Sequence, residues 1–208
     1  MTSDPENPTR RRTPVDDLRR IRDARTLKAL AHPVRVALQE ILSVDGPLTA
    51  TEAAERIGET PTTCSFHLRQ LAKYGFVEEA GGGKGRSRPW RARDQGLDIS
   101  SDLEDPEAAI AANTLARLWR ENQLRRLDRW REVRSSYPRE WREAAGHSET
   151  VMWMTAEELR ALNEELIGLL MNRFRERRND PSARPAGALP VETLLFNYPV
   201  GPPQGGGG

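Results

Sequence analysis

The sequence predicts a mainly α-helical fold with small β elements, that is, an α+β class. Apolar residues recur at helical spacing through most of the chain, whereas a basic, Gly-rich stretch at 76–92 has the pattern of a hairpin. A length of 208 residues with 37% hydrophobic content is enough for two small packed units. We therefore expect a disordered arm at 1–14, a first unit at 15–98, a second unit at 105–200 and a disordered tail at 201–208.

Three short helices are predicted at the start of the first unit. The first covers 23–31, and the second begins at Pro33, because proline fits the first turn of a helix. Thr49 and Glu52 are spaced as a capping box, which predicts a third helix that ends at Gly58.

A fourth helix is predicted at 60–74, with Thr60 as its N-cap. Cys64, Leu68 and Leu71 share one face, which packs, and the opposite face is free to enter a DNA groove. The residues assigned to DNA contact on this helix are Thr62, Thr63, Ser65, Phe66, His67, Arg69, Gln70 and Lys73. His67 flanks the packing face, so it either binds phosphate or supports the helix.

The hairpin at 76–92 follows directly and is strongly basic. Between residues 60 and 93 there are seven Lys or Arg residues against two acidic ones, although the whole chain has a net charge of only +1. Such a local surplus favours a polyanion such as DNA over the alternative of a solvated basic hairpin. We assign phosphate or minor-groove contacts to Lys84, Arg86 and Arg88.

Two helices joined by a tight turn, a projecting helix and a hairpin are the parts of a winged helix-turn-helix. The runs LKALAHPVRVALQEIL and TTCSFHLRQLAKYGFVEE resemble the ArsR/SmtB-type bacterial transcriptional regulators over residues 24–93. The resemblance implies a homodimeric regulator of a partly palindromic operator, usually a repressor, in which a helix after the wing helps dimerisation. Metal-sensing members carry paired cysteines in the helix before the recognition helix, and residues 51–57 contain none. Metalloid sensing is therefore not expected.

Residue types limit the other function classes. One cysteine and three histidines without ligand spacing predict no metal site, and no catalytic or cofactor motif occurs, so we expect neither an enzyme nor a cofactor. The string GGGKGRS lacks the order of a phosphate loop and is interpreted as the wing tip. The absence of a secretory or membrane-length apolar segment predicts a cytoplasmic protein with no membrane partner.

A long helix at 105–135 is predicted to open the second unit, with a broad apolar sector that needs a large partner surface. Asn122, Gln123 and Arg126 interrupt this sector. The interruption fits a register-fixing contact in a dimer, plain solvent exposure, or a face turned toward a ligand.

A β-α-β arrangement is predicted beyond the long helix. The expected strands are 149–154 and 191–198, and the helix between them starts at a Thr155–Glu158 capping box and runs to about residue 178. Tryptophans of this half form either an ordinary core, from Trp130, Trp141 and Trp153, or an aromatic-lined pocket. The residues of the candidate ligand pocket are Trp119, Asn122, Gln123, Arg126, Trp130 and Trp153.

The sequence thus predicts a sequence-specific regulator of transcription that binds double-stranded DNA, as a dimeric repressor. One alternative is a sensor whose unknown small-molecule effector binds the second unit. Another is a winged helix that contacts a protein partner. Arg10, Arg11 and Arg12 fit either a solvated tail or a minor-groove arm.

Overall fold

A computed structural model describes the chain at residues 19–81, 88–93, 97–99, 103–174, 176–177 and 180–201. The chain divides into two compact units. One comprises Leu18–Ser148, and the other combines Met1–Asp17 with Glu149–Gly208. In the described residues, no helix has the length and apolar character needed to cross a membrane.

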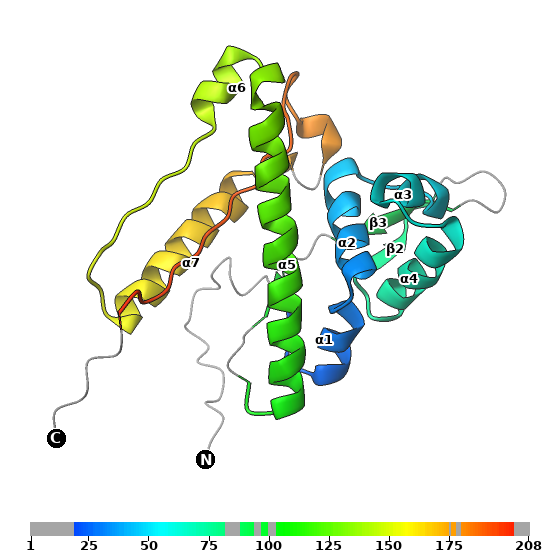
Figure 1. Cartoon of the computed structure of the whole chain (residues 1–208), viewed down its shortest axis with the longest axis horizontal. Coiled ribbons are helices and arrows are strands. Elements are labelled where there is room, and N and C mark those ends of the chain that lie inside the picture. Colours follow the sequence, from blue (N-terminus) through cyan, green and yellow to red (C-terminus); the bar gives the residue numbers. More distant parts are fainter. Residues whose placement is uncertain are drawn as a thin grey trace. The chain divides into compact units, whose positions relative to one another are not determined.

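Four helices form the first part of the unit Leu18–Ser148 (Figure 1): α1 (Ala24–Leu30), α2 (Pro33–Asp45), α3 (Ala50–Ile57) and α4 (Pro61–Lys73). Their starts follow the predicted caps. Thr49 and Glu52 form both halves of the capping box of α3. The hydroxyl of Thr60 accepts the backbone N–H of Thr63 at 3.1 Å, which caps α4. The helix-turn-helix is therefore specified by local sequence.

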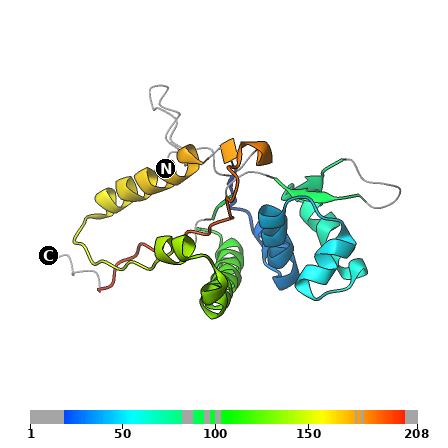
Figure 2. The same ribbon diagram turned by 90° about the horizontal axis from the view of Figure 1, so that it is seen from above.

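The wing is a two-stranded antiparallel hairpin (Figure 2), made of β2 (Val77–Glu79) and β3 (Trp90–Ala92). Gly75 lies between α4 and β2 with φ of 71°, a conformation that glycine adopts without strain. Leu48 extends the hairpin, because it exchanges two backbone hydrogen bonds with Trp90, at 2.9 and 2.8 Å. These contacts fix the wing to the α2–α3 connection.

A second small sheet joins the two ends of the winged helix. In it β1 (Arg19–Arg20) pairs in parallel with β4 (Leu97–Asp98), an element that the sequence did not predict.

The long helix α5 (Pro106–Val133) confirms the predicted one, and it packs against α1 and α2. Its first half lies in the same core as the helix-turn-helix, since Leu115 is completely buried together with Leu27 and Leu30 of α1. A 3-10 turn, η2 (Arg134–Ser136), and a short helix, α6 (Arg139–Ala144), follow. The Arg134 guanidinium bonds the carbonyl of Arg142 at 2.8 Å, which ties the two together.

In the other unit, helix α7 (Ala156–Arg173) starts at the predicted capping box of Thr155 and Glu158. It ends a few residues before the expected position near 178. A 3-10 turn, η3 (Pro181–Ala183), precedes the final described stretch. Within this unit the side chain of Asn197 donates to that of Asn163 at 2.7 Å, so the final stretch contacts α7.

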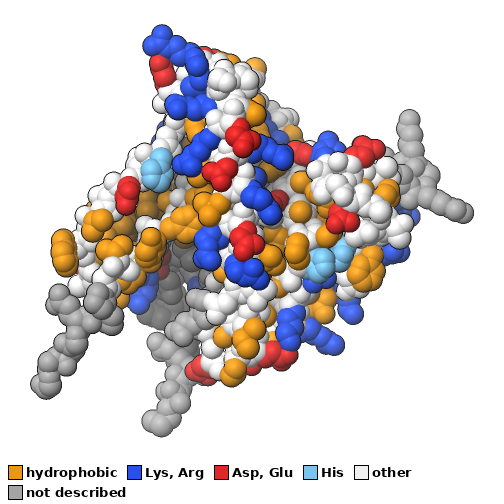
Figure 3. Space-filling view, viewed as in Figure 1, with side chains coloured by type: hydrophobic (Ala, Val, Ile, Leu, Met, Phe, Trp, Pro, Cys, Tyr) orange, Lys and Arg blue, Asp and Glu red, His pale blue; other side chains and the backbone are white. Residues whose placement is uncertain are grey.

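The strands predicted at 149–154 and 191–198 are wrong. Both stretches have irregular backbone conformation. A strand is stable only when a neighbour pairs with its backbone, and among the described residues no segment pairs with either stretch. Trp153 is 95% exposed, so it does not enter the apolar core predicted for Trp130, Trp141 and Trp153. Figure 3 shows hydrophobic side chains gathered at the surface over α7.

Candidate nucleic-acid interface

Helix α4 has a buried face and an exposed face. Cys64, Leu68 and Leu71 have no solvent exposure, as expected for the packing face. The assigned contact residues divide by exposure, with Thr62, Phe66, Arg69 and Lys73 exposed and Thr63, Ser65 and Gln70 half-buried. A rigid helix thus presents polar and aromatic side chains outward along one side.

Two of the residues assigned to DNA contact also have structural roles, and the sequence left this possibility open only for His67. The Thr63 hydroxyl lies 2.8 Å from the Thr60 hydroxyl, so it takes part in the cap of α4. His67 is only 8% exposed and lies on the packing side of the helix. Burial, followed by the nearby charges of His32 and Arg35, lowers the pKa of His67.

Phe66 is the large apolar side chain of the exposed face of α4, at 52% exposure. Its ring meets the His67 ring edge-on, with centroids 5.1 Å apart and planes at 77°. An aromatic edge contact of this kind restrains the ring. The contact with His67 therefore restrains the orientation of the exposed Phe66 ring.

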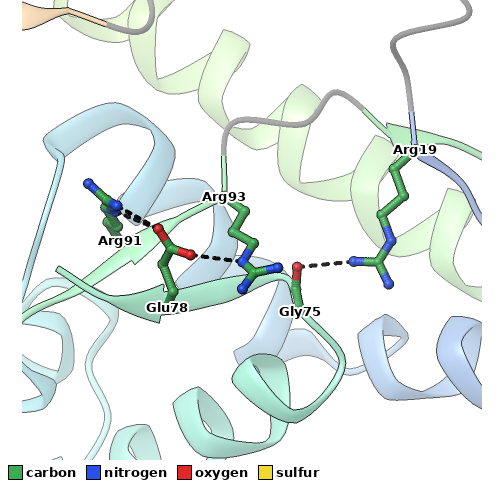
Figure 4. Close-up of polar contacts among 5 residues, drawn as sticks. All are labelled: Arg19, Gly75, Glu78, Arg91 and Arg93. Atoms are coloured by element: carbon green, nitrogen blue, oxygen red, sulfur yellow. Dashed lines mark hydrogen bonds and ion pairs between the residues drawn. The ribbon is translucent and has the colours of Figure 1, made fainter.

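Ion pairs cross the base of the wing (Figure 4). Glu78 on β2 pairs with Arg91 at 2.6 Å and with Arg93 at 2.9 Å, both from the β3 side. The hydrogen bond from Arg91 is the largest favourable contact of this carboxylate, and the pKa of Glu78 is lowered. The two arginines are exposed and Glu78 is half-buried, so each pair adds little stability. The single Glu78 carboxylate holds two of the seven basic residues counted in the sequence but offsets only one positive charge.

Among the wing residues assigned to phosphate contact, Arg88 is described, and Lys84 and Arg86 lie outside the described residues. Arg88 is exposed and pairs with Glu79 at 2.7 Å. Because the pair is solvent-exposed, a phosphate can replace the Glu79 carboxylate at small cost.

Arg19 supports the end of α4, a role that sequence reasoning missed. Its guanidinium donates to the carbonyls of Tyr74 at 2.8 Å and of Gly75 at 3.0 Å. It also lies 4.7 Å from the centre of the Phe76 ring. These carbonyls have no partner within the helix, so a cation there satisfies them and suits the helix dipole (Figure 4). No local pattern in the sequence signals this long-range contact.

The polar interruption of α5 is a contact between helices. Asn122 is 8% exposed and donates to a carboxylate oxygen of Glu40 at 3.1 Å. Arg126 pairs with the same oxygen at 2.6 Å. Both residues therefore bind α5 to α2 within one chain, and Gln123 beside them is half-buried.

The residues of the candidate ligand pocket are divided between the two units. Trp119 packs against the core, Trp130 lies under the Arg134 guanidinium at 5.5 Å, and exposed Trp153 belongs to the other unit.

Two hollows in the described structure are lined by other residues. One, of about 10 Å³, lies beside Arg19 and Gly75, and the other, of about 300 Å³, lies along α7. Among the described residues, no three His, Cys, Asp or Glu side chains are grouped to hold a metal ion.

Comparison with known proteins adds one family match. Residues 30–80 match a family described as a helix-turn-helix domain. The matched residues include all of α2, α3, α4 and β2, and the match supports a DNA-binding transcriptional regulator. No curated protein matches the chain. The solved structure of reduced HlyU from Vibrio cholerae N16961 is similar at 22% identity, over 45% of this chain and 83% of that chain, with a TM-score of 0.28.

Proposed function

We propose that this protein is a sequence-specific transcriptional regulator that reads double-stranded DNA with α4 and represses transcription as a homodimer. The exposed face of α4 is the observation that carries this proposal. The opposite face is locked into the core through Cys64, Leu68 and Leu71, so the exposed side chains are presented on a rigid support.

The chemistry of the exposed face suits base recognition. Arg69 is exposed and forms no ion pair with any described residue, which leaves its guanidinium free for the O6 and N7 atoms of guanine. Gln70 has the amide that pairs with adenine, and Phe66 can contact a thymine methyl group. A helix of this width fits the major groove of B-DNA.

The wing would then contact the DNA backbone. Arg88, together with Lys84 and Arg86, supplies cations whose phosphate contacts release counterions and give affinity without sequence preference. Arg91 and Arg93 are held by Glu78 and contribute less.

Dimerisation would use the part of α5 that the winged helix leaves uncovered. Ile110 is 68% exposed and Leu124 is 45% exposed, and their spacing of 14 residues places them on one side of the helix. A two-fold dimer through this side would place two recognition helices on half-sites about one DNA turn apart, or a multiple of it.

Selection of bound duplexes from a random DNA pool tests the proposal. We expect enrichment of an inverted repeat, and we expect Phe66→Ala to weaken binding to it. Arg160→Ala, which changes an exposed arginine of α7, serves as the matched surface control and should bind like the wild type. Recovery of unrelated sequences with equal affinity would contradict sequence-specific recognition.

A further inference from the structure

Three aromatic rings connect the start of α2 to the exposed face of α4. The rings of His32 and His67 stack with centroids 4.5 Å apart and planes tilted by 35°. The His67 ring in turn meets Phe66, which is exposed on the DNA-reading side. The three rings therefore form a continuous line of contacts from the start of α2 to the surface of α4.

The contacts of His32 require an uncharged imidazole. Its Nδ1 accepts the backbone N–H of Val34 at 3.2 Å and forms the N-cap of α2. A nitrogen accepts a hydrogen bond only while it carries no proton. Protonation of His32 would therefore remove this cap and bring a positive charge to the positive end of the α2 dipole.

The surroundings of His67 also favour the uncharged form. Its Nδ1 is buried and has no hydrogen-bond partner among the described residues. The imidazolium form would place an N–H donor on this nitrogen with no acceptor, which carries the full cost of desolvation. A second charge on the stacked His32 ring would add repulsion at close range.

The charged groups around the stack come from several elements. Arg35 of α2 acts on both rings as a like charge, and Glu59, in the turn before α4, opposes it. From α1, the carbonyl of Lys28 accepts the Arg35 guanidinium at 2.9 Å, and the Lys28 ammonium is paired with Glu107 of α5. On α4 itself the titratable neighbour is the buried thiol of Cys64, whose pKa is raised by burial.

We propose that His32 and His67 are positioning residues that hold α4 in its DNA-reading position only while both imidazoles are uncharged, so that operator binding weakens on acidification. The proposal rests on the proposed DNA-binding function. It names a form of regulation that the fold builds into the recognition helix.

The direction of the pH effect follows from the folded state. Burial is the largest cause that lowers the pKa of each histidine below the ordinary value of 6.5. The folded protein therefore binds fewer protons than the unfolded one near and below that pH. The contribution of the two uncharged histidines to the free energy of unfolding is fully present above about pH 6.5. It is lost as the pH falls through their lowered pKa values.

Operator affinity measured by fluorescence anisotropy at about pH 8 and about pH 5.5 tests the proposal, with the duplex recovered by selection as the probe. We expect the wild type to bind several-fold more weakly at about pH 5.5 than at about pH 8, because protonation of the two histidines disfavours the DNA-reading position of α4. His67→Phe keeps an uncharged ring, and His32→Asn keeps a cap acceptor. The ratio of the double variant's affinities at about pH 8 and about pH 5.5 should be close to one, whatever its affinity at about pH 8, because neither replacement side chain titrates in this range.

His147→Gln is the matched control, because His147 is an exposed histidine of the same unit and should leave the wild-type pH profile unchanged. If the double variant does not fold, His32→Asn alone should still reduce the pH dependence. Wild-type affinity that is constant over this range would overturn the inference. So would affinity that rises on acidification with a steeper salt dependence, which would indicate that His67 binds phosphate. Failure to select any operator at about pH 8 would instead refute the proposed function, and this inference with it.

Discussion

The unit Leu18–Ser148 and the segment Glu149–Gly208 of the other unit both contain a helix that starts at a capping box, yet they bury their apolar residues to different extents. In the first, large side chains such as Leu68 and Phe76 are almost completely buried. In the second, Val191 and Phe196 are 72% and 53% exposed. Large exposed apolar patches mark surfaces that interact with other molecules. The comparison teaches that the unit Leu18–Ser148 buries many of its large apolar side chains in one core, whereas those of the segment Glu149–Gly208 lie mainly at its surface.

The largest expected effect is a difference between the two units in how much a leucine-to-alanine substitution lowers the free energy of unfolding. Leu68→Ala removes a fully buried side chain and should lower the free energy of unfolding by about 2–5 kcal/mol. Leu195→Ala, at a leucine that is 43% exposed, should change it by less than about 0.5 kcal/mol. Urea unfolding followed by circular dichroism measures both. Equal losses would show that the second unit has a core comparable to the first.

The next largest effect concerns assembly through α5. Placing a charge at an exposed apolar position, as in Ile110→Glu or Leu124→Glu, should shift the dimer toward monomer and weaken operator binding by about tenfold or more. Ala116→Glu, at an exposed position that lies about 80° or more around the same helix from both residues, is the control. Analytical ultracentrifugation reads the oligomeric state. An undisturbed dimer in both variants would move the interface away from α5, and the exposed apolar residues of the second unit would then be the next surface to test.

Helix caps test whether the two units act separately in DNA binding. Thr49→Ala and Thr155→Ala each remove an N-cap and should each cost about 1 kcal/mol of stability. Only Thr49→Ala should also weaken the operator complex, since α3 packs against α4. Paired measurements of thermal unfolding and DNA affinity distinguish the two. A loss of affinity with Thr155→Ala would show that α7 influences the recognition helix.

The smallest expected effect lies in the wing. Glu78→Gln releases Arg91 and Arg93 from an exposed ion-pair cluster, so the unfolding midpoint should change little. The freed arginines should add about one to two phosphate contacts. Each added contact should steepen the slope of log affinity against log salt concentration by about one unit. Titrations at several salt concentrations measure this slope. An unchanged slope would place these arginines away from the DNA backbone.

Features encoded by neighbouring residues were predictable from the sequence. The caps at Thr49, Thr60 and Thr155 all form as expected, because a side chain that bonds a backbone N–H two or three residues away needs no tertiary partner. The two faces of α4 were also predicted correctly in Cys64, Leu68 and Leu71, since helical periodicity alone defines them.

Features that depend on distant partners were not predictable. The apolar runs at 149–154 and 191–198 have strand-like composition, but composition does not provide a pairing strand. Arg19 reaches Tyr74, and Asn122 reaches Glu40, over separations of 55 and 82 residues. Sequence spacing has no signal for such contacts, and the same holds for the stack that buries His67.

Base discrimination by α4 tests the central claim most directly. The affinity of wild type, Arg69→Ala and Gln70→Ala should be measured on a panel of duplexes that carry every single-base change of one operator half-site. We expect each variant to lose about 1–3 kcal/mol on the preferred site and to stop discriminating at one base position, which differs between the two variants. Variants that bind the preferred site as tightly as wild type, with the same preference at every position, would contradict the assignment of α4 as the reading helix.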